Sequence, residues 1–135
     1  MITLVADANI IFSFFSPKSK AREIAISGEV KLYSPKFLLK ELDEHKDEVK
    51  EKFGLNETQY QLVLELVKAV VEFIPLEDFK EFIEEASRIS PDKDDIQYLA
   101  LSMKLGTPLW SNDNRLKQQL RVKIVSTKEL IEILK

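Results

Sequence analysis

The chain has 135 residues, with 20 Lys or Arg and 23 Asp or Glu, so its formal net charge is −3. This length suits one domain, residues 1–135, that buries a core without disulfides, and the lack of cysteine excludes thiolate catalysis and cysteine-ligated zinc. The near-balance of charge argues against a protein that coats duplex nucleic acid, and the single histidine, His45, argues against a multi-histidine metal site.

No apolar run approaches the ~20 residues that span a bilayer. The first residues lack the basic start of a signal peptide, so we expect a cytoplasmic protein with no membrane contact. Only three glycines occur, which leaves no room for a glycine-rich phosphate loop. If the chain does chemistry, carboxylates are its main means.

The first half of the chain alternates short apolar runs with helical patterns. We predict strands at 2–6 and 30–33 and helices at 10–15, 21–26 and 36–52. A further helix begins at Asn56, where Gln59 completes a capping-box spacing. Its predicted buried stripe is Leu62, Leu66 and Val70, with Val63 and Val67 beside it.

The second half continues the alternation. We predict strands at 71–74, 108–110 and 122–125 and helices at 78–89, 91–105, 112–120 and 127–134. Gly28 and Gly106 are placed to end helices, and Thr127 to begin the last one. Strands that alternate with helices indicate an α/β fold in which helices cover both faces of a parallel sheet. Ligands of such folds bind outside the carboxyl ends of the strands, so acids at those ends carry the most information.

Two aspartates stand at the carboxyl ends of predicted strands. Asp7 follows the first strand and precedes an apolar helix, so it is equally an N-cap and a buried acid that needs a compensating partner. Asp113 follows the strand at 108–110 within a polar cluster, where turn and cap chemistry is a good explanation, so Asp113 alone is weak evidence for function. Neither residue alone decides between structure and function.

Two helices carry further candidates. One helix start carries three acids, Asp92, Asp94 and Asp95. Acids are favourable at a helix start because of the helix dipole, so this position alone does not indicate a function. At 100° per residue, Asp95 borders the buried face of that helix and Asp94 points nearly opposite. Glu41 borders the buried face of the helix at 36–52 and would pass as a surface acid without other evidence.

Together these segments resemble the PIN-domain family of metal-dependent nucleases, and within it the small prokaryotic ribonucleases of the VapC toxin type. The likeness lies in residues 5–11 (VADANII), Glu41 by its placement, residues 94–101 (DDIQYLAL) and residues 110–113 (WSND), in order along the chain. It implies a three-layer α/β/α fold with a central five-stranded parallel sheet. It also implies cleavage of RNA phosphodiester bonds with Mg²⁺ or Mn²⁺, an antitoxin protein as partner, and a homodimer.

The resemblance also implies roles for particular residues. Asp7, Glu41, Asp95 and Asp113 are the expected catalytic acids, and Asp7, Asp95 and Asp113 the expected ligands of the metal. Asn9 and Ser111 would orient those carboxylates by hydrogen bonds. Crowded carboxylates repel one another unless a cation neutralises them, and their oxygens suit hard Mg²⁺ or Mn²⁺. The RNA contacts that we expect are the basic residues that follow the strand-end acids, namely Lys18, Lys20, Arg22, Arg115 and Lys117.

Other functions remain open at this point. A phosphatase of the haloacid dehalogenase type needs a second Asp two residues after the first, where this chain has Asn9. A response-regulator receiver expects an acidic pair near the first strand, where this chain has Asp7 alone. A non-catalytic module that binds nucleic acid or protein on a PIN-like fold is the main alternative, and the four acids argue mildly against it.

Overall fold

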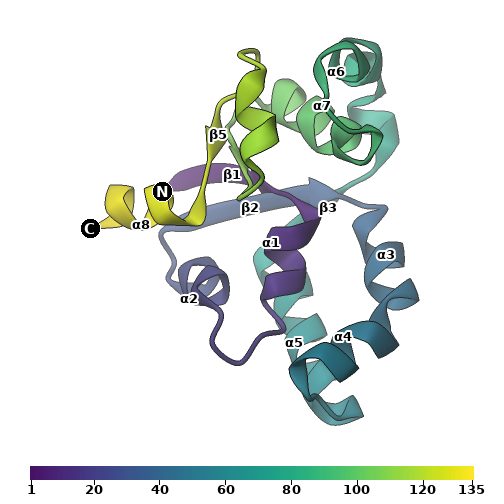
Figure 1. The fold of residues 1–135 in the computed structure, drawn as a ribbon, viewed down its shortest axis with the longest axis vertical. Coiled ribbons are helices and arrows are strands. Elements are labelled where there is room, and N and C mark those ends of the chain that lie inside the picture. Colours follow the sequence, from purple (N-terminus) through teal and green to yellow (C-terminus); the bar gives the residue numbers. More distant parts are fainter.

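Five parallel strands form one sheet in the order β3–β2–β1–β4–β5 in the computed structural model, which describes all residues 1–135 (Figure 1). The strands are β1 (Ile2–Ala6), β2 (Val30–Pro35), β3 (Val71–Ile74), β4 (Leu109–Trp110) and β5 (Ile124–Val125). Helices cover both faces, so the predicted three-layer α/β/α architecture with a five-stranded parallel sheet is confirmed.

The helices divide between the two faces of the sheet. In Figure 1, α1 (Ala8–Ser13), α2 (Lys20–Ile26) and α5 (Glu57–Val70) lie on one side, and α6 (Ile83–Ile89) and α7 (Ile96–Leu105) lie on the other. The remaining helices are α3 (Leu38–Glu44), α4 (Lys46–Phe53) and α8 (Thr127–Leu134). None of the helices is both long and apolar enough to cross a membrane.

The central strand β1 is apolar at Leu4, Val5 and Ala6, where both of its faces are buried, whereas Thr3 near its start is exposed. Leu4 and Ala6 belong to the core on the side of α1 and α2, whereas Val5 between them belongs to the core on the side of α7. Successive side chains of a strand point to opposite faces, so this run needs no polar alternation. β1 therefore holds the two halves of the molecule together and fixes where Asp7 emerges.

The predicted helix at 36–52 is wrong in its continuity. The structure has two helices, α3 and α4, which meet at His45, where φ is −100° and ψ is 13°. The imidazole of His45 contacts a carboxylate from each helix, Glu41 at 3.5 Å and Glu48 at 3.3 Å. These contacts anchor the residue at the bend.

The predicted buried stripe of α5 is wrong at Leu62, which is 67% exposed. Val67 is buried as predicted, Val63, Leu66 and Val70 are half-buried, and the buried Tyr60 was not part of the prediction. Tyr60 stacks on Phe15 with ring centroids 5.0 Å apart and donates a hydrogen bond to the carbonyl of Leu42 at 2.8 Å. Because Tyr60 fixes the rotation of the helix, Leu62, two residues on, is turned toward solvent.

The second half of the chain uses more 3₁₀ turns than predicted. The segment at 78–89 begins with η1 (Leu76–Asp78) and η2 (Lys80–Phe82), α7 is preceded by η3 (Lys93–Asp95), and the segment at 112–120 is η4 (Asn114–Gln118). The N-cap of α8 is Ser126 and not Thr127, because the Thr127 hydroxyl instead accepts a hydrogen bond from the Trp110 indole at 2.9 Å.

Candidate active site

The strand order reverses beside β1, and the candidate site lies at that position. β2 and β3 extend from one edge of β1, and β4 and β5 from the other. The backbone N–H of Asp7 donates to the carbonyl of Trp110 at 3.1 Å, so the residues that follow β1 and β4 emerge side by side. A crevice at the carboxyl ends of neighbouring strands, where strand order switches, is where open α/β sheets bind ligands.

Asp7 is both an N-cap and a pocket acid. Its carboxylate Oδ1 accepts a hydrogen bond from the backbone N–H of Ile10 at 2.9 Å, which caps α1. The residue is only 6% exposed. Burial raises the pKa of Asp7, the charge of Asp113 raises it further, and hydrogen bonding with Ser111 and Ile10 opposes the rise. The two interpretations of Asp7 from the sequence therefore coexist.

Asp95 is half-buried in η3, at the start of α7, and its carboxyl group is the most perturbed acid of the site. Burial raises its pKa to about 6, and the charges of Asp113, Asp7 and Asp92 add to that rise. Its Oδ2 atom is buried without any hydrogen-bond partner. The neighbouring Asp94 is exposed and contributes only to the pocket lining. An unpaired, repelled carboxylate oxygen of this kind is suited to a cation.

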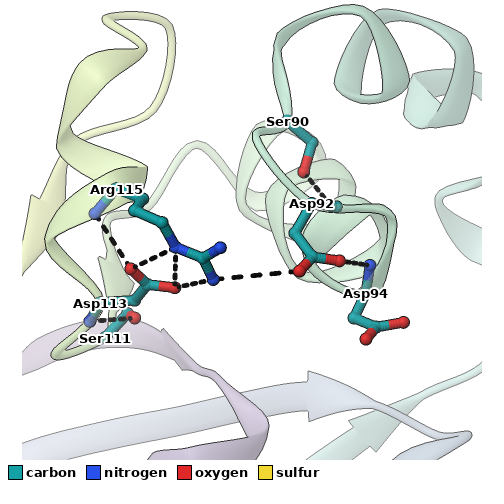
Figure 2. A network of polar contacts seen from close by, with 6 residues as sticks. All are labelled: Ser90, Asp92, Asp94, Ser111, Asp113 and Arg115. Atoms are coloured by element: carbon teal, nitrogen blue, oxygen red, sulfur yellow. Dashed lines mark hydrogen bonds and ion pairs between the residues drawn. The ribbon is translucent and has the colours of Figure 1, made fainter.

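Asp113 differs from Asp7 and Asp95 because a guanidinium group pairs with it (Figure 2). The Arg115 guanidinium binds both of its oxygens, with Nη2 at 2.8 Å from Oδ2 and Nε at 3.2 Å from Oδ1. This pairing holds the pKa of Asp113 below its usual range. Arg115 also reaches Asp92 across the pocket at 3.9 Å, and the backbone N–H of Asp113 donates to the Ser111 hydroxyl at 3.1 Å.

Glu41 reaches the site from α3 and completes the set. It lines the same pocket of about 460 Å³ as Asp7, Asp95 and Asp113, although the four acids come from different elements of the chain. Asn9 also lines this pocket, whereas Ser111 is fully buried beneath it between Asp113 and Asp7. The structure thus brings together all four predicted catalytic acids.

The donor set of the pocket fits a hard divalent cation. Six acids line it against two basic residues, Lys93 and Arg115. The buried, unpaired oxygen of Asp95 and the raised pKa values of Asp7 and Asp95 show that this negative charge is not neutralised internally. Carboxylate oxygens are ligands that Mg²⁺ and Mn²⁺ prefer. Binding of such an ion would also relieve the repulsion between the carboxylates.

The predicted ligands are not packed as closely as a bound ion would require. Only Glu41, Glu44 and His45 offer ligand atoms that all lie within 4.8 Å of one another, and this group sits at the end of α3, partly open to solvent. Asp7, Asp95 and Asp113 are spaced more widely, and Asp113 is held by Arg115. Binding of one ion by all three acids would therefore need small side-chain movements.

The predicted RNA contacts divide into one residue in the pocket and four outside it. Arg115 lines the pocket, whereas Lys18, Lys20, Arg22 and Lys117 do not. The Arg22 guanidinium donates instead to the carbonyls of Phe14 and Pro17, and Lys117 pairs with Glu129 of α8.

Sequence reasoning missed two residues that the pocket brings to the acids. Lys93 adds a second cation from η3, and Tyr98 adds a buried ring from α7. Tyr98 could have been found, because it follows Asp95 by three residues and therefore lies on the same side of the helix. Lys93 carries no such signal, since isolated lysines at helix starts are ordinary surface residues.

Comparisons with known proteins bear on the family and the fold of the chain. A family model described as PIN domain matches residues 5–133. A solved chain from the crystal structure of VapBC2 from Rickettsia felis, bound to a DNA fragment from their promoter, superimposes with a TM-score of 0.65. The match covers 93% of this chain and 98% of that chain at 12% identity, so it supports the fold alone. No curated protein sequence matches the chain.

Proposed function

This chain belongs to the PIN-domain family of nucleases, and we propose on that basis that residues 1–135 form one domain that cleaves RNA with Mg²⁺ or Mn²⁺. The observation that carries the proposal is the convergence of Asp7, Glu41, Asp95 and Asp113 on one pocket. The unpaired Asp95 oxygen in that pocket supports a cation as the missing partner.

The four acids divide between two tasks in this proposal. Asp7, Asp95 and Asp113 hold the ion, and the Asn9 amide and Ser111 hydroxyl help to orient them. When bound, the ion supplies positive charge for the attacked phosphate and lowers the pKa of a water molecule. Glu41 orients the attacking water and accepts its proton.

The reaction is a hydrolysis. The water oxygen forms a new bond to phosphorus, the bond from phosphorus to one bridging oxygen breaks, and that leaving oxygen takes a proton from solvent. Arg115 and Lys93 provide the positive charge that a polyanionic substrate needs beside an acidic pocket. The substrate that we propose is RNA with an accessible single strand, because a small acidic protein cannot follow a long duplex backbone by charge.

Cleavage of mixed single-stranded RNAs in the presence of Mn²⁺ tests the proposal. Wild-type protein should cut them and lose this activity in EDTA, and Asp7→Asn should be inactive. Asp94→Asn is the matched control, because Asp94 is exposed at the same pocket and should tolerate the change. Cleavage that persists in Asp7→Asn would refute the proposed site. Absence of both cleavage and calorimetric Mn²⁺ binding would favour a non-catalytic binding module.

We also propose that the protein acts in the cytoplasm as the toxin of a toxin–antitoxin pair and forms a homodimer. The VapBC2 chain, which shares the fold at 12% identity, supports the role in a toxin–antitoxin pair by analogy. Co-purification with the product of an adjacent small reading frame tests the antitoxin partner. Light scattering of the purified protein tests the dimer.

A further inference from the structure

Tyr98 carries a buried hydroxyl group that the fold does not use. The residue is 2% exposed on α7, and its ring packs edge-on against Phe37 with centroids 5.6 Å apart. Buried tyrosine hydroxyls normally have a hydrogen-bond partner, as Tyr60 has in the carbonyl of Leu42 at 2.8 Å. The Tyr98 hydroxyl has none.

The position of this hydroxyl links it to the acidic pocket. Three buried side-chain polar atoms of the chain lack a partner: Asp95 Oδ2, the Tyr98 hydroxyl and Ser102 Oγ. The first two belong to residues that line the pocket. Asp95 and Tyr98 are also three residues apart and share one side of the helix. An unpaired acceptor and an unpaired donor therefore belong to the same site.

The charges around Tyr98 determine what its hydroxyl can do. Burial raises the pKa of Tyr98 well above its usual value, and the charges of Asp7, Glu41 and Asp95 raise it further. The hydroxyl therefore stays protonated at any working pH and can donate a hydrogen bond. It lies close enough to Asp7, Glu41 and Asp95 for the charges of these three acids to act on it. Water would be ordered among the same acids once a cation is bound.

We propose that Tyr98 is a positioning residue of the loaded site, whose hydroxyl donates a hydrogen bond to a water molecule held among Asp7, Glu41 and Asp95. This inference rests on the proposed function and adds a residue to it. The hydrogen bond fixes the orientation of the water for attack on phosphorus, and the proton of the tyrosine is not transferred. Phenylalanine would pack equally well on Phe37 without burying an unpaired hydroxyl, so packing gives the hydroxyl no role.

Tyr98→Phe, compared with Tyr60→Phe, tests the proposal. Tyr98→Phe should lower kcat by about tenfold, the size of one hydrogen bond, while KM and the calorimetric affinity for Mn²⁺ stay within about twofold. Its melting temperature without metal should stay the same or rise. Tyr60→Phe breaks a buried hydrogen bond between two residues that do not line the pocket, so it should lower the melting temperature and leave kcat unchanged. An unchanged kcat in Tyr98→Phe, or a parallel loss of kcat, stability and Mn²⁺ affinity, would overturn the proposal.

A second measurement does not depend on cleavage. Water-proton relaxation of protein-bound Mn²⁺ reports the water on the ion, and Tyr98→Phe should change it at saturating metal, whereas Tyr60→Phe should not. A wild-type protein that binds Mn²⁺ but cuts no RNA would refute the proposed function, and the relaxation difference would still support Tyr98. No relaxation difference between wild type and Tyr98→Phe would refute the role of Tyr98 alone. A wild-type protein that binds no Mn²⁺ would refute both.

Discussion

Replacing Asp95 by asparagine should make the metal-free protein more stable at neutral pH. The Asp95 carboxylate is half-buried, one of its oxygens has no partner, and the charges of Asp113, Asp7 and Asp92 repel it. Asparagine keeps the shape and removes the charge, so the folded state loses a repulsion that the unfolded chain does not have. A change at a site acid that increases stability is a specific consequence of this pocket.

The magnitude follows from the pKa of Asp95, which rises from 3.8 to about 6 on folding. About two pKa units correspond to about 3 kcal/mol of stability at neutral pH. Solvent screens a carboxyl group that is only partly buried, so we expect about 1–2 kcal/mol, or about 3–8 °C in melting temperature.

The pH dependence has a defined sign. Because the folded pKa of Asp95 is raised, ionisation of this group destabilises the folded wild type. The advantage of Asp95→Asn should be complete above pH 6 and should shrink as the pH falls toward the unfolded value. We expect about a third of it to remain at pH 4.5.

Differential scanning calorimetry in EDTA at pH 7.5 and 4.5 measures this difference, with Asp94→Asn as the exposed neighbour that should change little. Saturating Mn²⁺ should reverse the order, because wild type gains binding energy that Asp95→Asn lacks. A variant that is less stable than wild type in EDTA at pH 7.5 would refute the electrostatic argument. So would an advantage of the same size at both pH values.

Other residues give smaller, separate tests. Arg115→Gln should slightly destabilise the metal-free protein at pH 7, because the guanidinium lowers the pKa of Asp113. The difference in stability should vanish as the pH falls through that lowered pKa. Denaturation curves of the variant that are displaced from wild type equally at pH 7 and pH 3 would contradict this. His45→Gln should keep kcat within about threefold, since the exposed imidazole contacts Glu41 but does not line the pocket, and a loss of about 100-fold would make it an acid–base group. Gly106→Ala should destabilise the fold by about 1 kcal/mol in urea titration, because Gly106 ends α7 at φ +66°, and an unchanged midpoint would show that the turn relaxes.

The order of the elements could be predicted because apolar runs and caps are local signals. β1 and the capping box at Asn56 both form as their sequences indicate. The exposure of Leu62 on α5 could not be predicted, because the rotation of this helix depends on the stacking of Tyr60 on Phe15, which lies in the turn after α1. The break at His45 could not be predicted either, because the apolar periodicity at 36–52 indicates one continuous helix. The imidazole at the break contacts a carboxylate from each of the two helices.

The acids that line the pocket could be singled out from the sequence only in part, because parallel strands bring Asp7 and Asp113 to one edge and helix facing favours Asp95 over Asp94. Glu41 was expected only from the resemblance, since its place on a helix is also that of a surface acid. What the sequence could not show is how each acid is compensated. Arg115 binds Asp113 and leaves Asp95 unpaired, and that difference depends on side-chain geometry. Tyr98 was missed for a related reason, since an aromatic residue on a buried helix face is ordinarily core.

The distribution of charge in the pocket determines how a cation can bind. β1 and β4 are neighbours, so Asp7 and Asp113 must lie close together, and the start of α7 adds Asp95. The charges of neighbouring acids help to raise the pKa values of Asp7 and Asp95, and a cation would relieve that repulsion between the ionised carboxylates. Asp113 already has Arg115 on both of its oxygens, so a cation that takes Asp113 as a ligand must compete with that guanidinium. The affinity of the pocket for metal therefore depends on two opposing contributions: relief of the repulsion at Asp95, and the cost of displacing Arg115 from Asp113. The displaced Arg115 side chain would still lie at the pocket, where a phosphate must bind.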